Sequence, residues 1–257
     1  MLGLSNNCSN VTEHNFHDQG SLVFDGVDDY IDIDNMAAVF ATAFTAGDQN
    51  EVNMTISAWV KLETMSSSGM IFNTRVGSGS TDTIHLFWHG SGNNLRFVTK
   101  YNNTAKTAED DGDGSYVASG AAENDGLWWH VVGTTAHEGD TALWINGVKR
   151  GHETLNTSKL LTGTLSQANI GSNTAEGANF NGNINDLAIW KRELSEAEIL
   201  TLYRNKNVDY TAIQGADLMV YYRFEEKSGT IATNDADTSK NGTITNGATY
   251  STNIQYR

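Results

Sequence analysis

An alternation of apolar and polar residues, repeated along most of the chain, limits what this sequence can fold into. The clearest case is MTISAWVKL, residues 54–62, in which every second residue from Met54 to Leu62 is apolar. A period of two places alternate side chains on opposite faces of a β-strand. Clusters such as VGSGSTD and HGSGNN separate the alternating stretches, and these residue types form turns. The pattern therefore predicts an all-β fold built from many short strands.

Two pairs of stretches have the arrangement of antiparallel hairpins. TIHLFWH and NLRFVTK flank a turn rich in Gly and Asn. LWWHVVGTTA precedes TALWINGVKRG, which contains Asn146–Gly147, the preferred pair for a type I′ turn. We expect a long acidic loop between about residues 101 and 126. Strands at this spacing pack as two sheets, because each sheet buries one apolar face against the other. The sequence predicts a two-sheet antiparallel sandwich.

The strongest helix signal lies in GNINDLAIWKRELSEAEI, residues 182–199. Ser195 and Glu198 have the spacing of a capping box, and Leu194 and Ile199 have the spacing of a hydrophobic staple. The sequence predicts one short helix that starts here.

The first half of the same stretch reads as a strand with an aspartate inside it. A period of two places Asp186 on one face with Ile184, Ala188 and Trp190, and places Asn185, Leu187 and Ile189 on the other face.

Four stretches resemble, in order, the signatures of the laminin-G-like, concanavalin A-like jelly-roll family. They are SLVFDGVDDYIDI, MTISAWVKL, LWWHVVGTT followed by ALWINGV, and NGNINDLAIWKRELSEAEI, and they span about residues 21–204. The resemblance implies a concanavalin A-like jelly roll with one short helix after the strand that ends at Trp190. We expect that helix to cover an open end or edge of the sandwich with Leu194, Ile199 and Leu202.

The chain divides into three predicted parts. Residues 1–20 are a polar N-terminal segment, 21–207 are the laminin-G-like jelly roll, and 208–257 are a C-terminal segment. The last part resembles the segment with which domains of the family begin, and it has few large apolar residues with which to form its own core. We expect it to complete the same sandwich; docking on a neighbouring subunit is the alternative.

Charge and composition exclude several classes of partner. The 31 acidic and 16 basic residues give a net charge of −15, which repels nucleic acid and anionic lipid. The sequence contains no run of 18 apolar residues, so we expect no membrane insertion. The first ten residues, MLGLSNNCSN, lack the features of a secretory signal. The one cysteine, Cys8, forms no internal disulfide.

The sequence predicts no enzyme and no catalytic residue. Glycoside hydrolases of this fold need two carboxylates about 5 to 9 Å apart, which a Glu-x-Asp-x-Glu strand would place on one face. No such triplet occurs: Glu225 and Glu226 are adjacent, and Asp28 and Asp29 belong to a turn. A Gly-x-Ser-x-Gly nucleophile elbow is also absent. A glycoside hydrolase is therefore a distant alternative.

The family resemblance implies one structural Ca²⁺ ion near the first and last family strands. Asp186 lies where the family places a carboxylate ligand, and Asp25 and Gly26 match the segment that offers carbonyl oxygens. In the other interpretation, Asp186 only accepts hydrogen bonds from a loop.

Tryptophan residues are the candidates for contact with a sugar, because an exposed ring stacks on the apolar face of a sugar. Trp88, Trp129 and Trp190 are assigned to the core or to the contact with the helix. Trp59, Trp128 and Trp144 lie opposite the main apolar stripe and are the predicted ligand-binding residues.

Two functions remain open at this stage. The first is a non-catalytic structural or adhesive module of a bacteriophage virion, because the chain resembles jelly-roll structural proteins of marine bacteriophages. Its partners would be other virion proteins or copies of itself. The second is a lectin-like module that binds a glycan, located outside the cell or on its surface.

Overall fold

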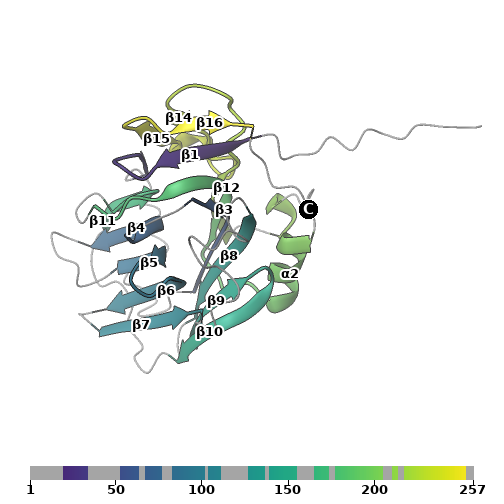
Figure 1. The fold of residues 1–257 in the computed structure, drawn as a ribbon. Helices are drawn as coiled ribbons and strands as arrows, with labels where there is room; N and C mark the ends of the chain where they lie inside the picture. The colour runs from purple at the N-terminus through teal and green to yellow at the C-terminus, as the bar shows by residue number, and fades with distance from the viewer. Residues whose placement is uncertain are drawn as a thin grey trace, which may run out of the picture.

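The described strands form two antiparallel sheets packed face to face as a sandwich (Figure 1). This arrangement confirms the predicted all-β jelly-roll fold. The computed structural model describes residues 20–33, 53–63, 67–76, 83–101, 104–110, 127–136, 139–154, 165–173, 177–204, 210–213 and 217–252.

Sheet A has the strand order β10-β9-β8-β3-β12-β1-β16, and β13 also pairs with β12. The long strand β12 pairs with β1 along its first half and with β13 along its second half. The strands of sheet A are β1 (Ser21–Asp25), β3 (Met54–Leu62), β8 (Trp128–Thr135), β9 (Asp140–Ile145), β10 (Val148–Thr154), β12 (Asn181–Trp190), β13 (Leu218–Tyr222) and β16 (Thr249–Ser251).

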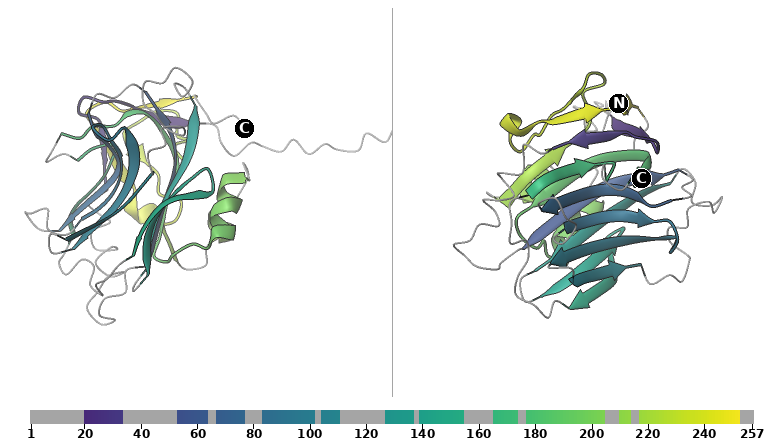
Figure 2. Two further views of the ribbon diagram at one scale, coloured as in Figure 1. Left: turned by 60° about the horizontal axis from the view of Figure 1, so that its bottom comes forward. Right: turned by 90° about the vertical axis from the view of Figure 1, so that its left-hand side faces the viewer.

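Sheet B has the order β14-β15-β2-β11-β4-β5-β6-β7, and Figure 2 (right) looks onto this sheet. Strand β7 occupies part of the predicted acidic loop. The loop prediction is therefore wrong for these residues, because β7 pairs with the edge of β6, and local sequence does not reveal this pairing. The strands are β2 (Tyr30–Asp32), β4 (Gly69–Val76), β5 (Thr83–His89), β6 (Asn94–Tyr101), β7 (Thr104–Glu109), β11 (Leu165–Ile170), β14 (Ile231–Ala232) and β15 (Gly242–Thr245).

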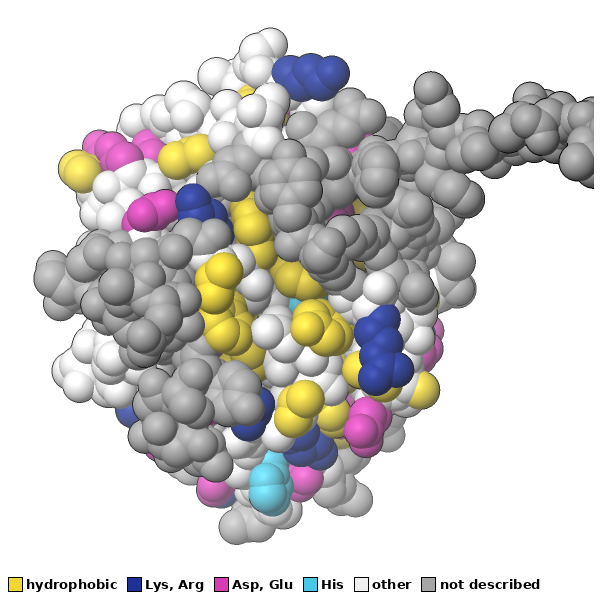
Figure 3. Space-filling view, turned by 45° about the vertical axis from the view of Figure 1, so that its right-hand side comes forward, with side chains coloured by type: hydrophobic (Ala, Val, Ile, Leu, Met, Phe, Trp, Pro, Cys, Tyr) yellow, Lys and Arg dark blue, Asp and Glu magenta, His cyan; other side chains and the backbone are white. Residues whose placement is uncertain are grey.

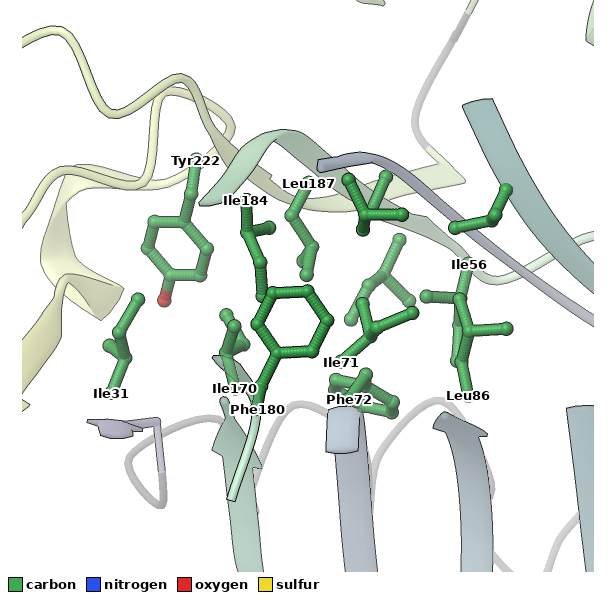
Figure 4. Packing of buried hydrophobic residues seen from close by; sticks show 14 of the residues in the cluster. Ile31, Ile56, Ile71, Phe72, Leu86, Ile170, Phe180, Ile184, Leu187 and Tyr222 are labelled. Carbon is green, nitrogen blue, oxygen red and sulfur yellow. The ribbon is translucent and has the colours of Figure 1, made fainter. Parts of the chain in front are cut away.

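The core lies between the two sheets and is formed by alternate residues of their strands. Ile56 and Ile184 from sheet A face Phe72 and Leu86 from sheet B, with Phe180 between them (Figure 4). Trp88 and Trp129 belong to the same core cluster, as the alternation predicts.

Helix α2 (Glu196–Arg204) begins with the predicted capping box. The backbone N–H of Ser195 donates to Glu198 Oε2 at 2.8 Å, and the backbone N–H of Glu198 donates to Ser195 Oγ at 3.4 Å. Leu194 and Ile199 are both buried.

The helix lies against the outer face of sheet A (Figure 2, left), not at an open end or edge of the sandwich as expected. The reason is that sheet A has a second apolar face. Ile199 and Leu202 of the helix share a buried cluster with Val132, Trp144 and Trp190 of the strands. A short 3₁₀ helix, η2 (Tyr210–Ile213), extends this cover.

A β-bulge interrupts strand β12 at Asp186. Asn185 pairs with Trp59 of β3, but Ala188 pairs with Ser57, so β12 contains one extra residue. Leu187 therefore joins the core, whereas Ala188 faces α2. The predicted alternation, which grouped Ile184 with Ala188 and Trp190, is wrong beyond this point because a bulge reverses the faces.

The C-terminal part of the chain contributes strands to both sheets. Strand β13 pairs with β12, β16 pairs with β1, and β15 pairs with β2. A second 3₁₀ helix, η4 (Thr238–Lys240), lies between β14 and β15. Of the N-terminal segment 1–20, only Gly20 is among the described residues. The described helices include none that is long and apolar enough to cross a membrane.

Candidate functional site

Two of the three predicted ligand-binding tryptophans are buried beneath α2. Trp59 is 3% exposed and stacks on Tyr203 of the helix, with ring centroids 5.9 Å apart. Trp144 is 6% exposed, and its indole N–H donates to Thr134 Oγ1 at 3.3 Å. The alternation placed both rings on the correct face but did not reveal that the helix covers it. Neither ring is an exposed platform, and this corrects the expectation.

Trp128 lies at the start of β8 opposite Lys61 of β3 and is partly exposed. Its indole nitrogen is buried and has no hydrogen-bond partner. Figure 3 views the side of the molecule that carries α2, where hydrophobic side chains gather near the centre. The role of Trp128 in binding a ligand stays a prediction.

Asp186 occupies the bulge of β12 with a backbone φ of 46°. Asp tolerates this left-handed conformation better than most residues do. Its Oδ1 accepts a hydrogen bond from the hydroxyl of Tyr221 at 3.0 Å. Burial raises the pKa of Tyr221, so this hydroxyl remains a donor. The bulge and this hydrogen bond explain why an aspartate lies within the strand.

The structure does not bring Asp186 together with Asp25 and Gly26. Asp25 pairs with Asn181, five positions before Asp186 on β12, which corresponds to roughly 16 Å along the strand. The calcium site predicted from these three residues is therefore not assembled as one site. Asp25 lies instead beside Asp28 and Asp29.

The outer face of sheet B differs from that of sheet A, because none of the described helices covers it (Figure 2, right). A row of paired residues with polar side chains crosses it from strand to strand. We call this the polar row; it consists of Asp32, Asn169, Asn73 and His85. Asn, Asp and His side chains at one level of a sheet offer several hydrogen-bond donors and acceptors to one ligand.

Two polar atoms of this row are buried without a partner. Asn73 Nδ2 and His85 Nε2 make no hydrogen bond, although the two residues pair directly across β4 and β5. Buried polar groups in folded proteins are almost always satisfied, by protein or by water. These two atoms are therefore the part of the sheet face best prepared for water or a ligand.

His85 is neutral at pH 7. Burial, together with the positive charges of Arg75 and Lys100, lowers the pKa of His85 to about 4. A neutral imidazole carries one donor and one acceptor, so it can bond to a hydroxyl group in either direction.

Aromatic rings continue along β5 from His85. Phe87 contacts His85 edge to face at a centroid distance of 6.2 Å, and contacts His89 at 6.0 Å. Phe87 is partly exposed. Arg96 lies opposite Phe87 on β6 and pairs with Glu109 at 2.7 Å. The face therefore combines an apolar ring with polar and charged side chains.

Sequence reasoning missed Asn73, His85 and Phe87 as candidate site residues. The alternation of TIHLFWH contained part of the signal, because Ile84, Leu86 and Trp88 point into the core and the residues between them must point outward. That Asn73 lies opposite His85 depends on the pairing of β4 with β5, which the sequence does not specify.

A comparison with protein families decides the classification. The family described as the concanavalin A-like lectin/glucanases superfamily matches residues 25–200. The chain belongs to this superfamily. No curated protein matches the chain.

Solved structures of other proteins have the same fold at low sequence identity. A putative carbohydrate binding protein from Bacteroides ovatus has a TM-score of 0.62 and 18% identity; the match covers 91% of this chain and 60% of that one. This chain thus spans less than two thirds of that protein. A heptameric SAP-like pentraxin from Limulus polyphemus has a TM-score of 0.59 and 15% identity, with coverage of 93% and 97%.

A third structure is the Ruminococcus gnavus IT-sialidase CBM40 bound to α2,3-sialyllactose. It has a TM-score of 0.55 and 15% identity, and the match covers 71% of this chain and 96% of that one. At these identities the likeness shows the fold.

Proposed function

We propose that this chain is a non-catalytic carbohydrate-binding domain whose ligand contacts the outer face of sheet B at Asn73 and His85. The observation that carries the proposal is the pair of buried, unpartnered polar atoms, Asn73 Nδ2 and His85 Nε2, on directly opposed residues.

The chemistry of the face suits a sugar. A sugar hydroxyl both donates and accepts, so it can accept from the amide of Asn73 and bond to the neutral imidazole of His85. The ring of Phe87, two positions along β5, is placed to pack against the apolar C–H face of the same sugar. Carbohydrate-binding faces combine these two kinds of contact.

The comparisons support the class of ligand. Two of the three similar structures named above are described as a carbohydrate binding protein and as a CBM40 bound to sialyllactose. A glycan partner would require a location where glycans occur, outside a cell or on its surface. The role in a bacteriophage virion, with virion proteins or copies of the chain as partners, stays a prediction.

The test measures glycan binding of two site variants, after a glycan array has identified a ligand. Asn73→Leu keeps the branched shape of the side chain and removes the amide; because leucine is bulkier than asparagine, urea unfolding checks that the variant is folded. The site is expected to lose binding about tenfold, because one hydrogen bond to a buried group is worth roughly 1.4 kcal/mol. His85→Gln should weaken binding to a similar degree, as measured by calorimetry.

The matched control is His152→Gln, since His152 is exposed on β10 of the other sheet. Binding by the control should equal that of the wild type. Unchanged affinity in both Asn73→Leu and His85→Gln would overturn the proposed site. An array without any bound glycan would overturn the proposed function.

A further inference from the structure

Two connections that cross between the sheets lie against each other at one end of the sandwich. The β1–β2 turn leads from sheet A to sheet B, and the β15–β16 turn leads back from sheet B to sheet A. Strand β16 pairs with β1, and β15 pairs with β2. The C-terminal turn therefore follows the path of the first turn, although more than 200 residues separate them: the side-chain amide of Asn246 donates to the carbonyl of Asp28 at 3.1 Å.

The β1–β2 turn carries three carboxylates at close range. Asp25, Asp28 and Asp29 each place a ligand oxygen within 4.8 Å of the others. In the part of the chain that the structure describes, no basic side chain pairs with any of these three aspartates. The mutual repulsion of three negative charges is thus left without a neutralising partner.

Asp29 provides a second and independent observation. Its side chain is only 3% exposed, and its Oδ2 accepts the backbone N–H of Asp25 at 2.9 Å. The other oxygen, Oδ1, is buried and has no partner. Burial raises the pKa of Asp29, as expected for a carboxylate that lacks a counter-charge. A buried carboxylate oxygen without a donor is a suitable ligand for a metal ion.

The C-terminal turn reaches this same oxygen. A Cβ atom on Gly247 would lie 3.3 Å from Asp29 Oδ1, and Gly247 has a backbone φ of 128°. The backbone of the β15–β16 turn at Gly247 is therefore next to the unpartnered oxygen.

We propose that Asp25, Asp28 and Asp29 bind one Ca²⁺ ion that fastens the β15–β16 turn to the β1–β2 turn. Ca²⁺ accepts carboxylate and carbonyl oxygens in a flexible geometry, whereas Mg²⁺ demands a near-ideal octahedron and keeps several of its waters. Compared with the site predicted from sequence, this one keeps Asp25, omits Asp186 and adds Asp28 and Asp29. It is independent of the proposed binding of carbohydrate on sheet B.

The first experiment titrates the EDTA-treated full chain with CaCl₂ in a calorimeter and follows its thermal unfolding at constant ionic strength. The wild type should bind one Ca²⁺ per chain and melt at a higher temperature with Ca²⁺. At a free concentration about 100 times the Kd, bound Ca²⁺ raises the folding equilibrium constant about 100-fold. MgCl₂ should give a smaller shift. Absence of calcium binding up to millimolar concentration would overturn the site.

The double variant Asp28→Asn, Asp29→Asn removes two charges with little change in shape. It should fold without Ca²⁺, because repulsion in the turn is relieved, and should lose the response to Ca²⁺. Asp237→Asn is the matched control, since Asp237 is an exposed residue of the same C-terminal segment, and it should keep the response. A double variant that still responds to Ca²⁺ like the wild type would refute these ligands.

Hydrogen exchange tests whether Ca²⁺ holds the β15–β16 turn against the β1–β2 turn. Ca²⁺ should slow amide exchange in residues 242–251 of the wild type and leave exchange in β5 and β6 unchanged. If Ca²⁺ binds but exchange in residues 242–251 stays the same, the ion does not fasten the C-terminal turn and that part of the proposal fails.

Discussion

The outer faces of the two sheets use their aromatic side chains in opposite ways. On sheet A, rings are stacked and covered: Trp190 lies on Tyr210 with centroids 5.9 Å apart, and Tyr210 lies on Tyr221 at 4.6 Å. On sheet B, Phe87 remains partly exposed beside His85, and Asn73 and His85 keep unpartnered polar atoms.

The difference teaches where to look for function in a sandwich of this kind. A face whose rings stack on a helix of the same chain contributes mainly to stability, because burying an aromatic ring removes a large apolar area from water. A face with unsatisfied donors and acceptors costs stability and is retained for binding, or is satisfied by water. Aromatic content alone therefore does not distinguish a face that stabilises the fold from a face that binds a ligand.

The largest expected effect comes from Trp59, which the sequence had suggested as a ligand platform. Trp59→Ala should lower the free energy of unfolding by about 3 to 5 kcal/mol, because the ring is almost fully buried against His130 and Tyr203. Unfolding in guanidinium chloride measures this change in the free energy of unfolding. The matched variant Trp128→Ala, at a partly exposed ring of the same face, should lower the free energy of unfolding by less. A stable Trp59→Ala protein that has lost its ligand would reverse the comparison between the two faces.

A smaller effect is expected at the start of α2. Ser195→Ala removes the capping hydroxyl, which bonds Glu198, and should cost about 1 kcal/mol in urea unfolding. Thr201→Ala is the control, since its hydroxyl only bonds the carbonyl of Ala197 within the helix. Ligand binding on sheet B should be the same in both variants. Loss of binding in Ser195→Ala would show that the two faces are coupled.

The pH dependence of stability also separates the two faces. The pKa of His85 is lowered from 6.5 to about 4, so the unfolded chain takes up its proton first as the pH falls. His85 therefore lowers the free energy of unfolding between about pH 6.5 and 4. Hydrogen bonds from Arg192 lower the pKa of Glu198 from 4.5 to about 2, so its stabilising effect is complete above pH 4.5 and is lost toward pH 2.

Urea unfolding at a series of pH values checks both assignments. His85→Gln should flatten the pH dependence of the free energy of unfolding only between about pH 6.5 and 4. Glu198→Gln should flatten it only between about pH 4.5 and 2. If both variants changed the same range, the assignment of one group to each face would not hold.

Some features were predictable because they depend on neighbouring residues. The period of two indicated the sandwich, and the Ser195–Glu198 spacing located the helix start. Asn146–Gly147 indicated the hairpin between β9 and β10, where both residues have positive φ values of 51° and 77°. The cover on Trp59, the edge pairing that forms β7 and the position of α2 depend on distant segments, so local sequence did not reveal them.

The sequence by itself determined the fold class, the family, the core tryptophans Trp88 and Trp129, and the capped helix, because alternation and capping act over a few residues. Only the tertiary structure decided which polar residues meet. One extra residue at Asp186 reversed the faces of β12, and strand pairing placed Asn73 opposite His85. The β15–β16 turn lies beside Asp29 because β15 pairs with β2 and β16 pairs with β1. The physical reason is that strand register and the cover of a face are set by contacts between distant segments, whereas side-chain alternation within one strand is local.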